Sequence, residues 1–261
     1  MKISIITVVW NNEETIGDAI ESVIGQDYDN FEYIIVDGGS TDSTLEIIDS
    51  YSKDIDFIVS EKDDGLYHAM NKGIDISTGD VIGILNSDDI YSNESVITDV
   101  CNAFLSNPHS DIFFGSTLMV DPHDINVNIR EYNCSNFKPW MMRFGFAPPH
   151  PSSFIKKNAY INYGVYKQNF KNAADFEIFL RLLYVNKLNY IHSDKVFVKM
   201  RIGGTSTSGF KANLISSKEI LEALLINNIY SNIIFVYLRF LLKIFQFKFF
   251  ATFKKKHETP S

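Results

Sequence analysis

Two adjacent carboxylates follow an apolar run in the segment Asn86-Ser87-Asp88-Asp89. The run before them, Val81 to Leu85, is typical of a buried strand, so we expect the carboxylates at a strand end. Carboxylate oxygens suit Mg²⁺ or Mn²⁺, which usually keep water or substrate phosphate in the coordination shell. An aspartate at this place can also cap a following turn. The spacing alone leaves both the metal site and the cap open.

Asp37 ends a second apolar run and is followed by Gly38-Gly39. Its carboxylate can accept hydrogen bonds from a nucleobase or a ribose, and the glycines permit close approach of the backbone. An ordinary turn before a helix capped by Ser40 or Thr41 is the alternative, and this segment taken alone favours the turn. The chain has neither a G-x-G-x-x-G motif nor a phosphate-binding P-loop, so a diphosphate held here would need a metal ion.

Three further side chains could do chemistry. Asp175 begins an amphipathic helix that is predicted to reach Leu183. A carboxylate at the start of a helix is either a catalytic base, whose charge the helix dipole stabilises, or an N-cap. Taken alone, Asp175 favours the N-cap. His150 lies among prolines, and Arg201 ends a strand before two glycines. Both can belong to loop structure.

Strands alternating with helices position these residues. The predicted sheet is mostly parallel and covered on both sides, and ligands of such sheets bind at the carboxyl ends of the strands. Polar segments gather at those ends: 10–12, 37–42 and 86–89. Strands are expected at 3–9, 33–36, 55–59, 81–85, 112–117, 127–132, near 190 and at 196–200, with helices at 16–24, 45–48, 67–75 and 175–183.

Composition limits the class of protein. The 261 residues are 45% hydrophobic and 21% charged, which supports one large α/β domain and excludes a disordered chain. Cys101 and Cys134 are too few for a disulfide framework and indicate reduced, cytosolic thiols. The apolar run at residues 3–10 is too short for a signal peptide and lacks a cleavage site. The net charge of −8 argues against nucleic-acid binding.

The basic residues are concentrated at the C-terminal end. After residue 230 the net charge is +5, so the first 230 residues carry −13. The apolar segment 233–250 contains Arg239, Lys243 and Lys248, too many charges for a membrane-spanning helix. We predict an interfacial helix with Arg239, Lys243 and Gln246 on one face, and attraction of Lys254 to Lys256 for anionic lipid. A helix packed on the domain is the alternative.

Seven segments share their order and spacing with one known family: Ser4 to Val8, Val36 to Asp42, Gly65 to Tyr67, Ala69 to Ile74, Gly79-Asp80, Asn86 to Asp89 and Ala173 to Asp175. The chain thereby resembles family 2 glycosyltransferases of the GT-A fold, from Lys2 to about Ser206. Within that family it most resembles the subgroup that builds bacterial surface polysaccharides such as O-antigen.

The resemblance implies a role for each matching residue. Asp175 is the general base, Asp88 and Asp89 hold Mn²⁺ or Mg²⁺, and His150 is a weaker candidate for acceptor contact. The donor nucleotide is assigned to Thr7, Val9, Asp37, Asp64, Asn71, Lys72, Asn86, Ser87 and Arg201. Asn86 stands where many relatives have an aspartate, and Met70 stands where many have an arginine. Lys72 or Arg201 is therefore expected to supply the positive charge.

The resemblance also implies organisation and function. Residues 1–206 form the GT-A domain, with a nucleotide-binding half at 1–110 and an acceptor half at 111–206, and 207–261 form a helical, membrane-associating tail. The expected reaction is inverting transfer of a hexose from a nucleotide sugar, commonly a UDP-hexose, to a saccharide on undecaprenyl diphosphate, at the inner face of the cell membrane. There are two alternatives. One is a polyprenyl-phosphate sugar synthase, and the other is a degenerate nucleotide-sugar-binding scaffold, which Asn86 supports.

Overall fold

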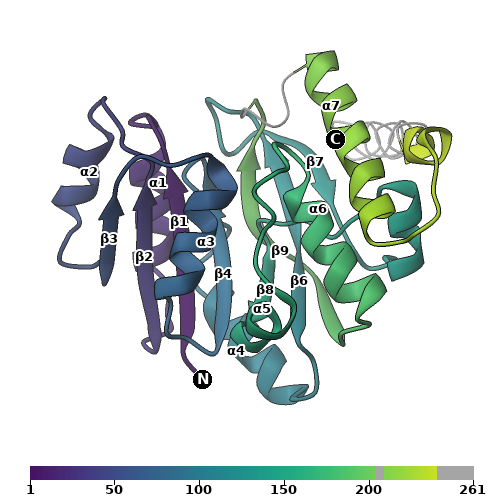
Figure 1. Cartoon of the computed structure of the whole chain (residues 1–261). Helices are drawn as coiled ribbons and strands as arrows, with labels where there is room; N and C mark the ends of the chain where they lie inside the picture. The colour runs from purple at the N-terminus through teal and green to yellow at the C-terminus, as the bar shows by residue number, and fades with distance from the viewer. Residues whose placement is uncertain (204–208, 240–261) are drawn as a thin grey trace, which may run out of the picture.

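A single twisted sheet runs through the computed structural model, which describes residues 1–203 and 209–239 (Figure 1). The strand order is β3-β2-β1-β4-β8-β6-β9-β5, and β7 pairs with β6 beside this path. Helices cover both faces, so the predicted α/β class is confirmed. The predicted halves share this sheet, and the predicted boundary at residue 206 lies outside the described residues.

The first half of the sheet is parallel. It consists of β1 (Ile3–Val9), β2 (Phe31–Asp37), β3 (Phe57–Ser60) and β4 (Val81–Asn86). The connecting helices are α1 (Ile16–Ile24), α2 (Thr44–Ser50) and α3 (Leu66–Ile76). All seven elements were predicted from the sequence, because their apolar positions repeat with the period of a buried strand or of an amphipathic helix.

The second half mixes parallel and antiparallel pairs. Its strands are β5 (Asp89–Tyr91), β6 (Ile112–Val120), β7 (Asn128–Tyr132), β8 (Ser153–Lys156) and β9 (Tyr190–Arg201). Its helices are α4 (Val96–Ser106), η1 (Pro139–Phe144), α5 (Lys157–Tyr163), α6 (Ala174–Phe179), η2 (Leu180–Val185) and α7 (Gly209–Ile226). The two strands expected near 190 and at 196–200 are one strand, β9. The elements that were not predicted from the sequence are β5, β8, α4, η1 and α5.

Each face of the sheet packs against its own set of helices. Ile6 and Val8 of β1 face a cluster that includes α3, α5, α6 and α7, whereas Ile3 and Ile5 face α1, α2 and α4. Burial of every β1 side chain explains its unbroken apolar run. Gly83 of β4 lets β8 approach, since a Cβ atom there would lie 2.5 Å from the Phe154 ring.

The described part of the C-terminal tail packs on the domain. Phe235 stacks on Phe144 of η1 with ring centroids 5.2 Å apart, and the buried Arg239 donates to Ser217 Oγ at 3.0 Å. The prediction of an interfacial helix with Arg239 on one face is therefore wrong for Arg239, because its side chain is buried beside Gly145 and Ser217 of α7. Lys243 to Lys256 lie outside the described residues. Within residues 1–203 and 209–239, no helix is both long enough and apolar enough to cross a membrane.

Candidate active site

The carboxyl ends of three neighbouring strands meet at one edge of the sheet. Val9 pairs with Asp37, and Val8 pairs with Asn86, so the segments that follow β1, β2 and β4 begin side by side. Asn12 Nδ2 donates to Ser87 Oγ at 2.8 Å and joins two of these segments directly. The polar segments therefore gather as the strand order predicts.

Asp89 is a deeply buried carboxylate at this edge. Its side chain is 1% exposed; Oδ2 accepts a hydrogen bond from Asn86 Nδ2 at 3.1 Å, while Oδ1 has no hydrogen-bond partner. The Asn86 Oδ1 atom is likewise buried without a partner. Burial raises the pKa of Asp88, and burial with the neighbouring Asp88 charge raises the pKa of Asp89 well above its usual value. The chain continues into a strand, so the helix-cap interpretation is not supported.

These oxygens fit a divalent cation whose shell is completed by a ligand. Within the described residues, no three His, Cys, Asp or Glu side chains gather as a metal site, so the protein itself would offer Asp88 and Asp89. Mg²⁺ and Mn²⁺ are commonly bound by one or two carboxylates together with substrate phosphates. The unpaired Asp89 Oδ1 is the feature that such a cation would satisfy.

Arg201 joins the carboxylate segment to helix α1. Its guanidinium donates to the main-chain oxygen of Asp88 at 2.9 Å and pairs with Asp18. The side chain is buried and comes from the end of β9. Arg201 thus fixes the turn that carries Asp88, and its predicted contact with donor phosphate stays a prediction.

Asp37 organises the glycine turn beside this edge. It accepts hydrogen bonds from the main-chain N–H of Gly39 at 3.0 Å and of Ser40 at 3.1 Å, and from Ser60 Oγ at 2.7 Å. The turn is therefore present, but the helix after it begins at Thr44 behind Ser43, so capping by Ser40 or Thr41 is wrong. The predicted contact of Asp37 with the base stays a prediction. Trp10, which follows β1, is 66% exposed and lies against Gly38. This aromatic face was not singled out from the sequence.

In the loop before α3, Asp63 rather than Asp64 faces the site. The Asp63 side chain is 7% exposed and pairs with Lys72, whereas the Asp64 side chain is 90% exposed. Lys72 also pairs with Glu61 at 2.8 Å. Burial lowers the pKa of Lys72, but the two carboxylates outweigh it and leave the pKa raised. The predicted nucleotide contact of Asp64 stays a prediction, Asp63 is the buried carboxylate of this loop, and Lys72 is a cation already held by carboxylates.

Three other residues that were predicted to contact the donor nucleotide have their side chains bound within the protein or buried in it. Thr7 is fully buried on the α1 side of the sheet, where its Oγ1 accepts from Tyr33 at 3.0 Å; assigning its side chain to the nucleotide is wrong. Asn71 exchanges two hydrogen bonds with the main chain of Tyr166, at 2.8 and 3.0 Å, so it is a structural clamp. Val9 buries its side chain, and its carbonyl accepts from Gly38 at 2.9 Å, so only its main chain lies at the edge.

Asp175 lies in an aromatic wall beside the N-terminus of α3. The Tyr67 hydroxyl lies at the main-chain N–H groups of Ala174 and Asp175, and Tyr67 stacks on Tyr166 with centroids 5.8 Å apart. Burial raises the pKa of Asp175 to about 6, although the Phe176 N–H donates to its Oδ1 at 2.7 Å. A carboxylate with this pKa is mostly ionised at neutral pH and can accept a proton.

His150 supports this wall. Its Nε2 lies 2.8 Å from the Tyr166 hydroxyl, and burial lowers its pKa to about 4, so the imidazole is neutral. Its predicted contact with an acceptor stays a prediction.

The sequence that forms this edge matches one known family. The model of "Glycosyl transferase family 2" matches residues 4–169. The chain belongs to glycosyl transferase family 2. It is 25% identical over 226 residues to the "PGL/p-HBAD biosynthesis glycosyltransferase" of Mycobacterium tuberculosis, covering 85% of this chain and 83% of that one. It is also 30% identical over 190 residues to an "Uncharacterized glycosyltransferase" of that species, covering 70% and 69%.

Solved structures of other glycosyltransferases share the fold. Residues 1–349 of Staphylococcus aureus TarS, in complex with UDP-GlcNAc, superpose with a TM-score of 0.67 at 21% identity, over 86% of this chain and 67% of that one. The chain corresponds to 40% of full-length TarS. The mannosyltransferase PcManGT from Pyrobaculum calidifontis, with GDP-Man and Mn²⁺, superposes with a TM-score of 0.61 at 15% identity, over 85% and 63%. The predicted GT-A architecture is confirmed.

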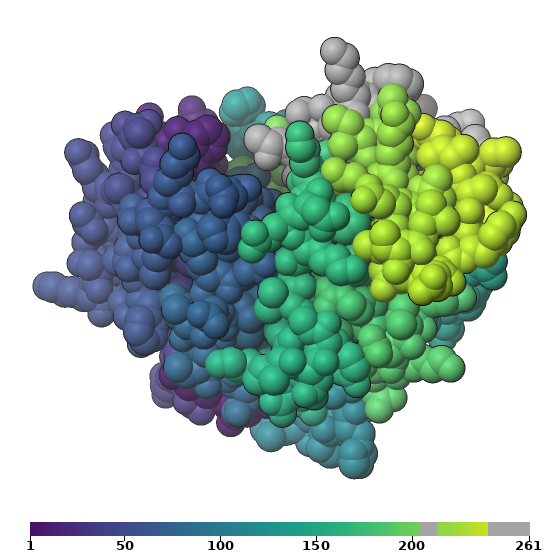
Figure 2. All heavy atoms as spheres, in the orientation of Figure 1, coloured from purple at the N-terminus to yellow at the C-terminus, as the bar shows by residue number. Residues whose placement is uncertain are grey.

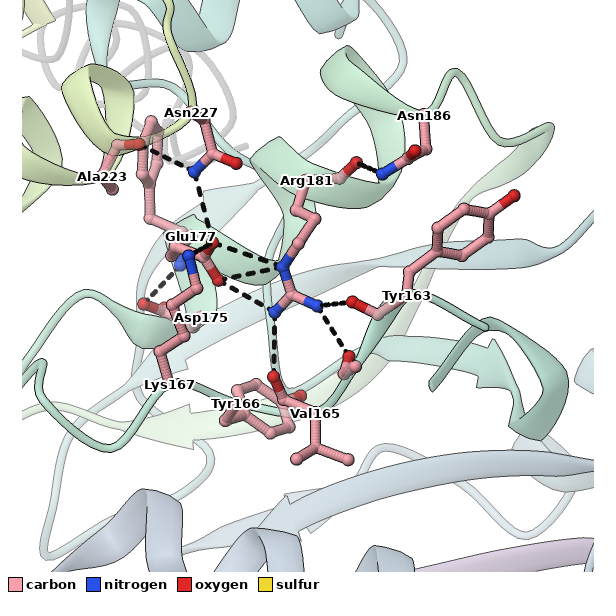
Figure 3. Close-up of polar contacts among 12 residues, drawn as sticks. Tyr163, Val165, Tyr166, Lys167, Asp175, Glu177, Arg181, Asn186, Ala223 and Asn227 are labelled. Carbon is pink, nitrogen blue, oxygen red and sulfur yellow. Dashed lines mark hydrogen bonds and ion pairs between the residues drawn. The ribbon is translucent and has the colours of Figure 1, made fainter. Parts of the chain in front are cut away.

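In this family 2 enzyme a buried ion-pair network supports the wall around Asp175 (Figure 3). Arg181 donates to the main-chain oxygens of Tyr163, Gly164 and Val165, and pairs with the fully buried Glu177 at 2.9 Å. This network fixes the loop that carries Tyr166. The sequence analysis missed it, although Glu177 and Arg181 have the i, i+4 spacing of a helical ion pair.

Proposed function

We propose that this family 2 glycosyltransferase is an inverting, metal-dependent hexosyltransferase that moves a hexose from a UDP-hexose to a saccharide acceptor. The observation that carries the proposal is the position of Asp175 against Tyr67, at the start of the helix that follows the Asp63 loop. A carboxylate with a raised pKa beside the start of α3 supports a general base on the acceptor side of the proposed donor site. The nucleotide sugars named with TarS and PcManGT support a donor of that class.

In the proposed mechanism, Asp175 accepts the proton of an acceptor hydroxyl as that oxygen attacks the anomeric carbon. The bond between the anomeric carbon and the diphosphate breaks from the opposite side, and the nucleoside diphosphate leaves with the electron pair. One carboxylate base is sufficient, because the acceptor is the nucleophile and no glycosyl-enzyme forms. A divalent cation held by Asp88 and Asp89 would supply charge neutralisation for the leaving diphosphate.

Ligand-dependent unfolding tests the donor site. A nucleotide at a hundredfold excess over its dissociation constant stabilises a protein by about 2.7 kcal/mol, or roughly 5–10 °C for a domain of this size. We expect this shift with UDP and Mn²⁺, and its loss without metal or in Asp88→Ala. The comparison with GDP and dTDP identifies the base. No shift with any nucleotide would favour the degenerate scaffold.

The base is tested by Asp175→Asn. We expect transfer, measured as acceptor-dependent release of UDP, to fall at least a hundredfold, because a general base contributes about 10²–10⁴-fold. The stabilisation by UDP and Mn²⁺ should persist, since Asp175 lies outside the carboxylate pair. Loss of both together would place Asp175 in the scaffold. Polyprenyl phosphate as an alternative acceptor distinguishes the sugar-phosphate synthase.

We further propose an acceptor carried on undecaprenyl diphosphate, in the synthesis of O-antigen or another surface polysaccharide, with the enzyme peripheral on the inner face of the membrane. Exposed Trp140, Tyr230 and Ile234 near the described end of the chain support this, together with the basic sequence after residue 240.

Vesicle binding tests the membrane proposal. We expect co-sedimentation with anionic vesicles to decrease when residues 240–261 are removed, and when Ile234→Ser alters the apolar surface. Leu105, exposed on α4, is the matched control as Leu105→Ser. The proposal fails if both tail variants bind as the wild type does.

A further inference from the structure

Helix α7 lies beyond the residues matched by the family model, yet it contacts the segment that leads to Asp175. The Glu219 carboxylate accepts the main-chain N–H of Lys171 at 3.0 Å and of Asn172 at 2.8 Å. At the end of α7, Asn227 donates to Glu177 at 3.2 Å (Figure 3). The yellow-green atoms of α7 and of the chain after it lie against the green atoms around α6 in Figure 2.

Helix α7 is itself a fixed support. Ile220, Ala223 and Leu224 are buried in the core, and Ser217 accepts a hydrogen bond from the buried Arg239. A carboxylate on a fixed helix that binds two successive main-chain amides restrains the position of that backbone. Lys171 and Asn172 precede Asp175 by only four and three residues, so the restraint is transmitted to the base through Ala173 and Ala174, both of which are buried.

We propose that Glu219 is a positioning residue for Asp175: it holds residues 171 and 172 so that the Asp175 carboxylate stays in the orientation needed for proton removal. This inference rests on the proposed role of Asp175 as the base. It extends the set of residues that act in catalysis to α7, through the contact of Glu219 with residues 171 and 172.

The charge on Glu219 gives the proposal a second consequence. Burial raises the pKa of Asp175, the negative charge of Glu219 raises it further, and the positive charge of Arg239 lowers it. Tyr67, Tyr132 and Tyr166 also face Asp175, but burial raises their pKa values, so they stay neutral. Removing the Glu219 charge should therefore lower the pKa of Asp175.

The test uses the full-length enzyme and three variants: Glu219→Ala, Glu219→Gln and, as a matched control, Glu222→Gln, which alters an exposed carboxylate on the same helix. We expect Glu219→Ala to lower kcat about a hundredfold, because a displacement of about 1 Å can have this effect. The stabilisation by UDP and Mn²⁺ should be unchanged. In Glu219→Gln the acid limb of the pH–rate profile should move to lower pH, whereas Glu222→Gln should match the wild type.

A second readout separates this inference from the proposed function. The Asp175 carboxyl carbon is titrated by ¹³C NMR, with Asp175→Asn for assignment, and its midpoint should fall in Glu219→Gln. If the midpoint falls while the wild type transfers no sugar, the proposed function fails and the positioning of Asp175 by Glu219 stands. If the wild type is active and both the midpoint and the pH–rate profile of Glu219→Gln match those of Glu222→Gln, the inference is overturned. A folded Glu219→Ala with wild-type kcat also overturns it.

Discussion

Glu32 and Asp89 are buried carboxylates at opposite ends of the same sheet, and they differ in how fully their oxygens are hydrogen-bonded. Glu32 and Asp89 are each 1% exposed. Glu32 lies at the amino end of β2 and accepts hydrogen bonds from Ser4 Oγ at 2.6 Å and from the Thr78 N–H and hydroxyl at 2.5 Å, while pairing with Lys2 at 2.6 Å. At the carboxyl end, the Asn86 amide and the main chain of Arg201 stabilise the charge of Asp89, while its Oδ1 has no hydrogen-bond partner.

The pKa values of Glu32 and Asp89 are shifted in opposite directions. Burial by itself would raise the pKa of Glu32, but Lys2, Ser4 and Thr78 outweigh it and lower the pKa to about 2. For Asp89, burial and the Asp88 charge raise the pKa well above its usual value. Folded proteins rarely leave a buried polar atom unpaired unless a ligand, water or ion satisfies it. Glu32 therefore has the partners of a residue that stabilises the fold, whereas Asp89 has an oxygen that the cation of the proposed function would satisfy.

The largest expected effect is that of Asp89→Asn. We expect the stabilisation by UDP and Mn²⁺ to disappear and UDP release to fall at least a hundredfold, because the site loses a carboxylate that the diphosphate-bound cation needs. The thermal midpoint of the ligand-free protein should not decrease, since the variant removes a buried charge whose oxygens are not all paired. If Asp89→Asn lowers the thermal midpoint but keeps the stabilisation by UDP and Mn²⁺, Asp89 has a structural role like that of Glu32.

Glu32→Gln should give the opposite result. An amide in place of the buried carboxylate removes its ion pair with the partly exposed Lys2 and weakens its charged hydrogen bonds, which lowers the free energy of unfolding by about 3–5 kcal/mol. For a domain of this size, that corresponds to a decrease in thermal midpoint of roughly 6–20 °C. The nucleotide-induced shift and kcat below the midpoint should match those of the wild type. Urea unfolding provides the free energy, and a variant with unchanged stability would contradict the assignment.

The pH dependence of stability sharpens the same contrast. Since the folded pKa of Glu32 is lowered from 4.5 to about 2, its contribution is present above pH 4.5 and is lost as the pH falls toward 2. This corresponds to roughly 3 kcal/mol. Urea unfolding at intervals between pH 6 and pH 2.5 should show that the wild type loses more stability than Glu32→Gln. Parallel curves for the two proteins would mean that Glu32 does not titrate in this range.

The fold was predictable where burial leaves a pattern in the sequence. Strand β1 is covered on both faces and β4 is almost fully buried, so each consists of an apolar run. Strand β8 has only four residues, and its pairing with β4 and β6 comes from distant parts of the chain, so no local pattern identifies it. Helix α4 did carry a signal, because its buried positions repeat every three or four residues, and the analysis missed it.

The site was predictable by residue type and strand end, but not by side-chain direction. Their residue type and their place after an apolar run predicted Asp88 and Asp89 at the carboxyl end of β4, where the structure has them. Adjacent loop residues point in opposite directions, so the sequence did not separate Asp63 from Asp64. The alternation along β1 places Thr7 on the same face of the sheet as Ile5. It does not show that the Tyr33 hydroxyl binds Thr7 within that buried face. Glu219 contacts the segment before Asp175 only through tertiary packing, which no local spacing encodes.

The smallest expected effect concerns the exposed aromatic residues at the two ends of the sheet. Trp10 follows β1 at the carboxyl end, and Phe57 begins β3 at the opposite end. If the indole beside Gly38 stacks on the nucleotide base, Trp10→Ala should raise the dissociation constant of UDP with Mn²⁺ about tenfold, since base–aromatic stacking is worth about 1–3 kcal/mol. Titration calorimetry measures this constant. Phe57→Ala should leave it unchanged, because that ring is exposed away from the carboxyl ends; an equal change in both variants would remove Trp10 from the nucleotide site.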